Sequence, residues 1–142
     1  MPENEFAGFL EAQNPVYNQV ISELAQGRKE THWMWFIFPQ LKGLGRSATA
    51  GRFALQSLEQ ARRYANHPVV GQRLRHCIQL VLNVPGHNLS EIFDYPDDLK
   101  FHSCVTLFAQ AVPEEPLFTL ALAKYFNGNR DNHTLALLGL ED

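Results

Sequence analysis

The sequence predicts an all-α fold, a single compact domain of about six to eight helices that spans residues 1–142. Apolar side chains recur at three- and four-residue spacing along most of the chain, which is the period of an α-helix. Prolines and capping residues stand where most of these segments begin. Only residues 34–38 form a plausible β run, and no second run is available to pair with it. A chain of 142 residues is about one domain and can bury a core without disulfides or metals.

The N-terminal part predicts two helices. A short helix is expected around residues 6–10. Asn14 is the expected N-cap of the second helix, with Pro15 at the first helical position, and Gly27 ends it. The apolar stripe of the second helix is Tyr17, Val20, Ile21 and Leu24.

The middle of the chain predicts three more helices. Ser47 caps one that runs through Phe53 and Leu55. Ser57 and Gln60 have the spacing of a capping box and begin the next. Pro68 opens a longer helix. The stripe of the capping-box helix is Leu58, Ala61 and Ala65, and that of the longer helix is Val70, Leu74, Cys77, Ile78 and Val81.

The C-terminal third begins with an irregular connection over residues 84–96, in which Ser90 caps a single turn. Pro96 begins a helix to about Ala111, Pro116 begins another that stops at Gly128, and a last helical turn follows residue 132. The expected apolar stripes are Phe101, Cys104, Val105, Phe108 and Val112 on the first of these helices, and Leu117, Leu120, Ala121 and Tyr125 on the second.

The composition is that of a globular protein, with 45% hydrophobic and 19% charged residues. The first ten residues carry no basic region, so no secretory signal is expected. No apolar run approaches the ~20 residues that cross a bilayer, so no membrane span is expected. With only Cys77 and Cys104, the chain is expected to keep reduced thiols in a bacterial cytoplasm.

The net charge of −3 hides an uneven distribution. Residues 28–75 hold nine basic and two acidic side chains, whereas the remainder holds three basic and thirteen acidic ones. A basic middle third attracts an anionic partner. Alternatively, the two parts of the chain pair with each other. The acidic remainder and a pI near 6.0 argue against a dedicated nucleic-acid binder.

The segment 29–47 is the first candidate for function, because it holds both tryptophans and a glycine-rich turn ahead of Arg46 and Ser47. Backbone N–H groups, a helix start and an arginine together suit a phosphate or carboxylate. His32 is a candidate proton carrier, and the expected ligand-binding residues are Lys29, Trp33, Trp35, Gln40, Gly43, Gly45, Arg46 and Ser47. The alternatives are an ordinary structural turn, aromatic core residues and a buried, hydrogen-bonded histidine.

The second candidate is the block 97–106. Asp98 is a candidate general base, Lys100 its charge partner or an anion binder, and Ser103 and Thr106 are candidate ligand contacts. The alternatives are close helix packing through the small hydroxyl side chains and a surface pair between Asp97 and Lys100.

Several other chemistries lack their motif. Histidines and cysteines never fall into the spacings of zinc sites, and the chain has no Walker loop, dinucleotide fingerprint or nucleophile elbow. Cys104 lies on the expected apolar helix face, where an inert thiol is predicted. We therefore expect no metal and no cofactor.

Three blocks, THWMWFIFPQLKGLGRS, NHPVVGQRL and PDDLKFHSCVTLF, together with the tail GNRDNHTLALL, resemble a family of small bacterial proteins catalogued as a domain of unknown function. Some members carry the name calpastatin. The chain departs from the usual pattern at Thr31, where serine is usual, and at Cys104-Val105, where a small residue and methionine are usual. The resemblance implies a mostly helical domain and no established activity.

Two functions are compatible with these residues. One is a small-molecule enzyme or binder acting on an anionic ligand that resembles a phosphate, a nucleotide or ADP-ribose, if the blocks 29–47 and 97–106 meet. The other is a non-catalytic structural or protein-interaction domain, with the aromatic segment as core or homodimer interface. The sequence does not decide whether the protein is an enzyme.

Overall fold

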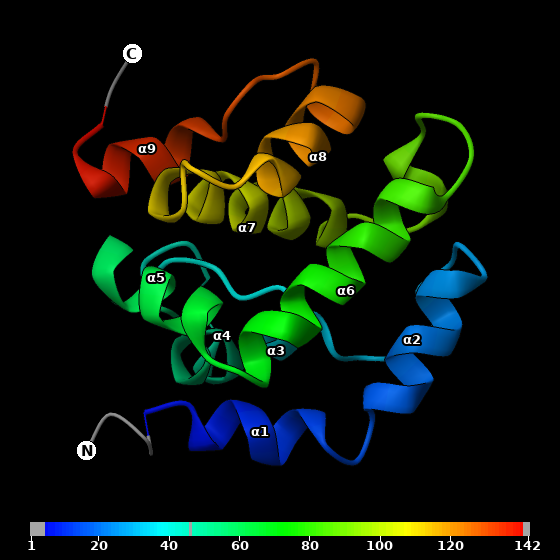
Figure 1. The fold of residues 1–142 in the computed structure, drawn as a ribbon, viewed down its shortest axis with the longest axis horizontal. Coiled ribbons are helices and arrows are strands. Elements are labelled where there is room, and N and C mark those ends of the chain that lie inside the picture. Colours follow the sequence, from blue (N-terminus) through cyan, green and yellow to red (C-terminus); the bar gives the residue numbers. More distant parts are fainter. Residues whose placement is uncertain (1–4, 46, 141–142) are drawn as a thin grey trace.

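The computed structural model describes residues 5–45 and 47–140, and within them the chain is entirely helical apart from turns and loops. Seven of the nine α-helices in this part of the chain have seven or more residues, which confirms the predicted all-α class (Figure 1). The α-helices are α1 (Ala7–Gln13), α2 (Tyr17–Ala25), α3 (Met34–Ile37), α4 (Ala48–Arg52), α5 (Leu58–Asn66), α6 (Val70–Asn83), α7 (Asp97–Ala111), α8 (Pro116–Phe126) and α9 (Asn132–Leu138). A 3-10 turn, η2, covers Leu89–Glu91.

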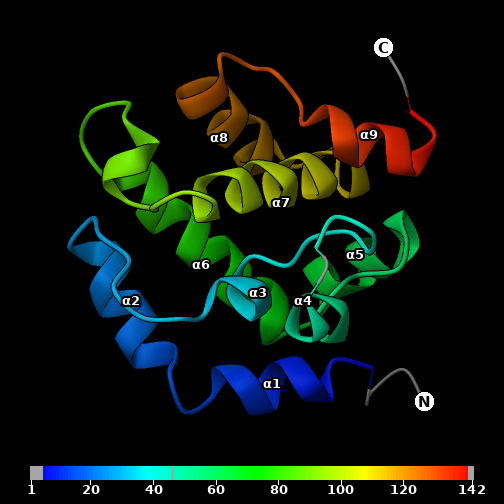
Figure 2. The same ribbon diagram turned by 180° about the vertical axis from the view of Figure 1, so that it is seen from behind.

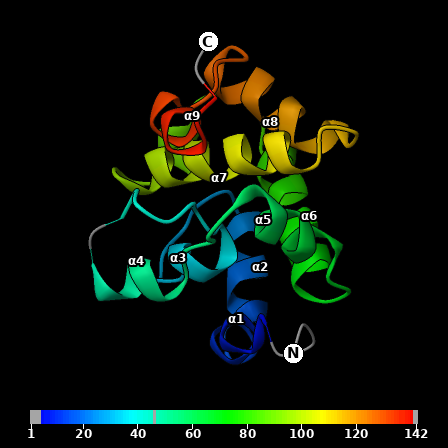
Figure 3. The ribbon, with the colours of Figure 1, turned by 90° about the vertical axis from the view of Figure 1, so that its left-hand side faces the viewer.

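Helix α7 is the centre of the fold. It packs against α5 on one side and against α8 and α9 on the other, while α6 contacts α2, α5 and α8. Figures 1 and 2 show α8 and α9 above α7 from both directions, and Figure 3 shows the loops around α3 and α4 below it, with α1 at the far edge. Because α7 is enclosed on several sides, nine of its fifteen residues are buried.

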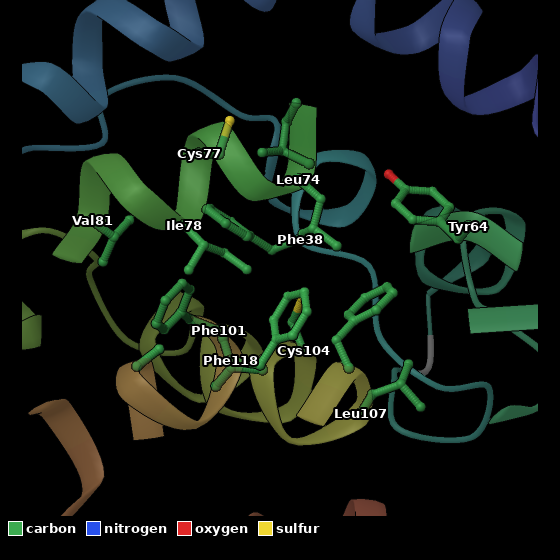
Figure 4. Packing of buried hydrophobic residues seen from close by; sticks show 14 of the residues in the cluster. Phe38, Tyr64, Leu74, Cys77, Ile78, Val81, Phe101, Cys104, Leu107 and Phe118 are labelled. Atoms are coloured by element: carbon green, nitrogen blue, oxygen red, sulfur yellow. The ribbon is translucent and has the colours of Figure 1, made fainter. Parts of the chain in front are cut away.

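The core is one cluster of buried apolar side chains that extends from α1 to α8. Figure 4 shows Ile78 of α6, Phe101 of α7 and Phe118 of α8 close together in it, with Tyr64 of α5 farther to the right. The ring of Phe38, which follows α3, packs edge-on against Phe101 at a centroid distance of 5.1 Å. Such edge-to-face pairs add about 0.5–1.5 kcal/mol to the burial of the rings.

Most of the predicted helix starts and stops are confirmed. Ser47 Oγ accepts a hydrogen bond from Ala50 N (3.0 Å), and Ser57 Oγ accepts one from Gln60 N (3.1 Å). Gly27 follows α2 with φ +80°, in the left-handed region where glycine avoids the strain of a Cβ. The whole predicted stripe of α6 is buried.

Four boundary predictions were wrong in detail. Asn14 does not cap α2, because its backbone N–H closes the last turn of α1 by bonding Leu10 O (2.9 Å). Helix α4 ends at Arg52, since the chain turns so that Leu55 forms an isolated parallel bridge with Leu41. The capping box is only half formed, because Gln60 Oε1 accepts from Gln56 N. The turn at η2 is capped by Asn88, whose Oδ1 accepts from Ser90 N (3.2 Å).

The one plausible β run, residues 34–38, lies largely in α3, in which Met34 and Ile37 are buried on one face. One prediction of side-chain direction was wrong. In α8 the buried residues are Phe118, Ala121 and Leu122, whereas Leu120 is 55% exposed. Within the described residues, none of the helices is both long enough and apolar enough to cross a membrane.

Candidate functional site

The two candidate blocks meet at one pocket of about 440 Å³, which we call the central pocket. It lies between the loop after α3, the first turns of α7 and the start of α9. The lining residues are Gln40, Leu44 and Gly45 from the loop, Pro96, Leu99, Lys100, His102 and Ser103 at α7, and Asp131 and His133 at α9. Residues about fifty and ninety positions apart therefore share this pocket.

Lys100 is held at the pocket by the aromatic segment. Its ammonium lies 4.8 Å from the centroid of the Trp35 ring and 3.6 Å from Asp97 Oδ1. The other oxygen of the same carboxylate, Asp97 Oδ2, is 2.9 Å from the Nζ of Lys29, which in turn lies over the ring of Trp33. Two lysines thus share one carboxylate, so the group carries a net charge of +1.

Asp131 is held by hydroxyl side chains from α7 and α9. Its Oδ2 accepts hydrogen bonds from Ser103 Oγ (2.9 Å), Thr134 Oγ1 (2.6 Å) and Thr134 N (3.2 Å). Its backbone N–H donates to Thr106 Oγ1 (2.9 Å). The small hydroxyls of α7 therefore do more than allow close helix packing, because they fix the start of α9.

A second hollow of about 490 Å³ adjoins the central pocket, and we call it the outer hollow. Asn129, Arg130 and Asn132 line it, and it shares His102, Asp131 and His133 with the central pocket. The imidazole of His102 stacks on Phe126 with a centroid distance of 3.9 Å and an interplanar angle of 10°. Its Nε2 lies 2.8 Å from Asn129 O and therefore carries a proton, because a carbonyl oxygen only accepts.

Behind the pocket, the buried carboxylate of Glu23 holds the aromatic segment in place. Its Oε1 accepts hydrogen bonds from Trp33 Nε1 (2.9 Å), Glu30 N (2.6 Å) and Thr31 N (3.0 Å). Its Oε2 accepts from Thr31 Oγ1 (2.6 Å) and Gln19 Nε2 (2.9 Å). Burial raises the pKa of Glu23, but the hydrogen bonds from Thr31, Glu30 and Gln19 outweigh it and lower the pKa from 4.5 to about 2.

The predicted site residues fall into three groups. Gln40, Gly45, Lys100 and Ser103 line the central pocket. Trp35 and Thr106 stand one contact away, through Lys100 and Asp131 respectively, and Lys29 stands two contacts away, through Asp97 and Lys100. Outside the pocket lining are His32 and Asp98, the buried Trp33, Gly43 against Leu137, and the helix cap Ser47.

Arg46 lies outside the described residues, although its neighbour Gly45 lines the central pocket. The pocket residues that sequence reasoning missed are mainly His102, Asp131 and His133. The spacing of Asp131 and Thr134 indicates a helix cap, since aspartate commonly caps a helix through the residue three positions later, and it does not indicate a pocket. The tail also belonged to the blocks that carried the family resemblance.

Neither cysteine belongs to the site. Cys77 and Cys104 are buried, and burial raises the pKa of Cys77 to about 12 and that of Cys104 well above its usual value of 9.0. This confirms that Cys104 lies on the buried face of α7, as predicted. In the described part of the chain, no three His, Cys, Asp or Glu side chains are grouped so that they could hold a metal ion.

Comparisons with known proteins show the family and the fold. A family model described as "Protein of unknown function (DUF1810)" matches residues 3–138. The chain is 48% identical to the conserved hypothetical protein Rv1873 from Mycobacterium tuberculosis, whose crystal structure superposes with a TM-score of 0.93. That match covers 96% of this chain and 98% of the other. No curated protein matches the chain.

Proposed function

We propose that the protein, which belongs to the DUF1810 family as its sequence blocks predicted, binds a small anionic molecule in the central pocket. The family is described only as of unknown function, so the proposal rests on the geometry of the pocket. The ligand class is a phosphate ester or a related anion. The sharing of Asp97 between Lys29 and Lys100 carries this proposal.

The charge at the pocket supports an anion. One carboxylate neutralises only one of the two lysines, and Lys29, with a side chain 9% exposed, is the closer partner of Asp97. Lys100 is farther from the carboxylate and more exposed, at 22%, and it lines the pocket. The positive charge that Asp97 leaves over is therefore available to a ligand from the side of Lys100, while the carboxylate of Asp131, which also lines the pocket, is held by Ser103 and Thr134. Trp35 orients that ammonium, because a cation is attracted to the face of an indole ring.

The shape of the pocket supports a small ligand with both polar and apolar parts. Leu44, Pro96 and Leu99 form an apolar part of the lining, and the polar part comes from Gln40, Lys100, His102, Ser103, Asp131 and His133. Pockets for small molecules commonly combine apolar walls with a few polar groups that set the orientation. His32 and Asp98 do not line this pocket, so we include them in no proton transfer and assign no reaction.

The test is to measure binding of sugar phosphates and nucleotides to wild type and to Lys100→Met by calorimetry. We expect the variant to bind at least about tenfold more weakly, since a charge-assisted contact contributes roughly 1.5–3 kcal/mol. Lys42→Met is the matched control. Lys42 is an exposed lysine in the loop after α3, and it does not line the pocket. Equal affinities of the two variants, or no binding of any probe to wild type, would overturn the proposal.

A protein-interaction domain is the second candidate, favoured by the apolar rim of the same pocket. Tyr95 is 78% exposed and Leu99 is 51% exposed, one on either side of Pro96 and the start of α7. This surface replaces the aromatic segment as the interface, since Trp33 is buried in the core. Sedimentation of wild type and Tyr95→Ser over a range of protein concentrations tests it. A concentration-dependent dimer that Tyr95→Ser abolishes would favour this candidate.

A further inference from the structure

The junction of the central pocket and the outer hollow is built around the carboxylate of Asp131. We propose that Asp131 recognises a hydroxyl group of the ligand, so that the protein takes a phosphorylated sugar rather than a simple anion. This inference rests on the proposed function, because it concerns the same ligand. Its specific content is that the ligand extends from the central pocket towards the outer hollow, with its phosphate beside Lys100 and its sugar hydroxyls at Asp131.

The two oxygens of Asp131 differ in their surroundings. Oδ2 accepts all three of the hydrogen bonds that described side chains and N–H groups donate to this carboxylate. Oδ1 receives none of these bonds, and no described side-chain N or O atom is both buried and without a partner. Among the described residues Oδ1 therefore has no donor and is not buried, while the carboxylate itself is fixed through Oδ2.

A fixed carboxylate with one open oxygen favours a donor over an anion. An ionised carboxylate only accepts hydrogen bonds, so it repels a phosphate and attracts a hydroxyl. Ser103 and Thr134 prevent the group from turning away, which reduces the entropy that a ligand hydroxyl must overcome when it binds.

The cation for the phosphate is Lys100, which lines the same pocket as this carboxylate. Arg130 is exposed and lines the outer hollow, where its guanidinium donates to hydroxyl oxygens of the same ligand. The stacked ring of His102 and the side chain of His133 line both hollows and so bound the path between the two parts of the ligand.

The experiment compares ribose 5-phosphate with methyl phosphate, which has the same anionic group and no free hydroxyl on its carbon. Calorimetry on wild type should show ribose 5-phosphate binding at least about tenfold more tightly. Asp131→Asn should reduce this ratio towards one and leave methyl phosphate bound as well as before or better. Lys100→Met should weaken both probes by similar factors.

A second variant covers the case in which Asp131→Asn does not fold. Ser103→Ala keeps the charge of Asp131 and removes one donor from Oδ2, so it should lower the ratio of affinities without abolishing binding. If wild type binds both phosphates equally, the inference about Asp131 is overturned and the anion-binding proposal stands. If neither binds, both are overturned.

Discussion

At the scale of single residues, Glu23 decides the position of the aromatic segment. Its side chain is one of the few buried charged groups, with a residue exposure of 3%, and five donors bond to its two oxygens. A buried carboxylate is tolerated when it is hydrogen-bonded in this way. The loop that carries Lys29 and Trp33 is thereby tied to α2.

Replacement of Glu23 by glutamine should destabilise the fold by about 2–3 kcal/mol at pH 7. The glutamine amide would direct N–H groups at backbone and indole donors, and a buried donor without an acceptor costs free energy. Urea unfolding measures the loss. Glu11→Gln, on the exposed face of α1, is the control and should leave the urea midpoint unchanged.

The effect of Glu23 should also depend on pH. Because the folded pKa of about 2 lies below the ordinary value of 4.5, the stabilisation is present above pH 4.5 and is lost as the pH falls towards 2. At ~1.4 kcal/mol per pKa unit, the loss amounts to about 3 kcal/mol. The stability difference between wild type and Glu23→Gln should therefore shrink over this range. A difference that stays constant from pH 7 to pH 2 would contradict this account.

The residues of the candidate site were predictable in part. Lys100 and Gln40 were named because charged and amide side chains next to a glycine turn or a helix start suggest ligand contacts. That both line one pocket was not predictable, since nothing in the spacing states how α7 crosses the loop after α3. Asp131 was missed because its sequence neighbourhood indicates a helix cap, and its contact with Ser103 crosses 28 positions of the chain.

At the scale of the elements, the close approach of α5 and α6 depends on Gly71. A Cβ placed on this residue would lie 2.2 Å from the carbonyl oxygen of Ala65 and 2.9 Å from that of Tyr64. Both neighbours are backbone atoms, so only a shift of one helix can relieve the overlap.

Gly71→Ala should therefore destabilise the protein by about 1–3 kcal/mol, the typical cost of forced movement of packed elements. Gly51→Ala is the matched control. Gly51 also lies in a helix, a Cβ there meets no atom within 4 Å, and alanine should stabilise the protein by roughly 0.5–1 kcal/mol. Thermal unfolding of both variants provides the comparison. A similar melting temperature for the two would disprove the packing argument.

The helices were predictable to the extent that their ends have chemical markers. Ser47, Ser57, Gly27 and Pro116 mark ends that the structure keeps. The buried face of α8 was not predictable, because apolar residues occupy more than one face of this helix, Leu117 and Leu120 on one and Phe118 and Leu122 on another. Periodicity then favours neither face. The same ambiguity affects α3, where a continuous apolar run has the pattern of a strand as well as of a buried helix turn.

At the scale of the whole molecule, the basic middle third is paired with the acidic remainder. Among the described residues, five ion pairs join residues 28–75 to acidic side chains outside that segment, namely Arg28–Asp94, Lys29–Asp97, Arg62–Glu114, Arg63–Glu5 and Arg75–Glu115. The uneven charge of the sequence is thus largely neutralised by ion pairs within the fold. Of the two alternatives that the charge pattern left open, internal pairing is the one with direct contacts.

These pairs should differ in their contribution to stability, and Arg75–Glu115 should contribute most among the arginine pairs. Arg75 bonds both oxygens of Glu115 (2.8 Å each) and also donates to Ala65 O (2.6 Å), and both side chains are about three-quarters covered. A double-mutant cycle with Arg75→Ala and Glu115→Ala should give a coupling of about 1 kcal/mol or more in urea unfolding. Arg75→Ala alone should cost more than Glu115→Ala, because it also leaves Ala65 O without its donor.

The cycle for Arg62 and Glu114 is the control, since side chains that are 48% and 56% exposed are screened by solvent and salt. Its coupling should be smaller and should fall when the salt concentration is raised, whereas the coupling of Arg75 and Glu115 should persist. Equal couplings that vanish together in salt would mean that the pairs act only as surface charges. The two parts of the chain would then be held together by the apolar core alone, and the basic segment would be available to an anionic partner.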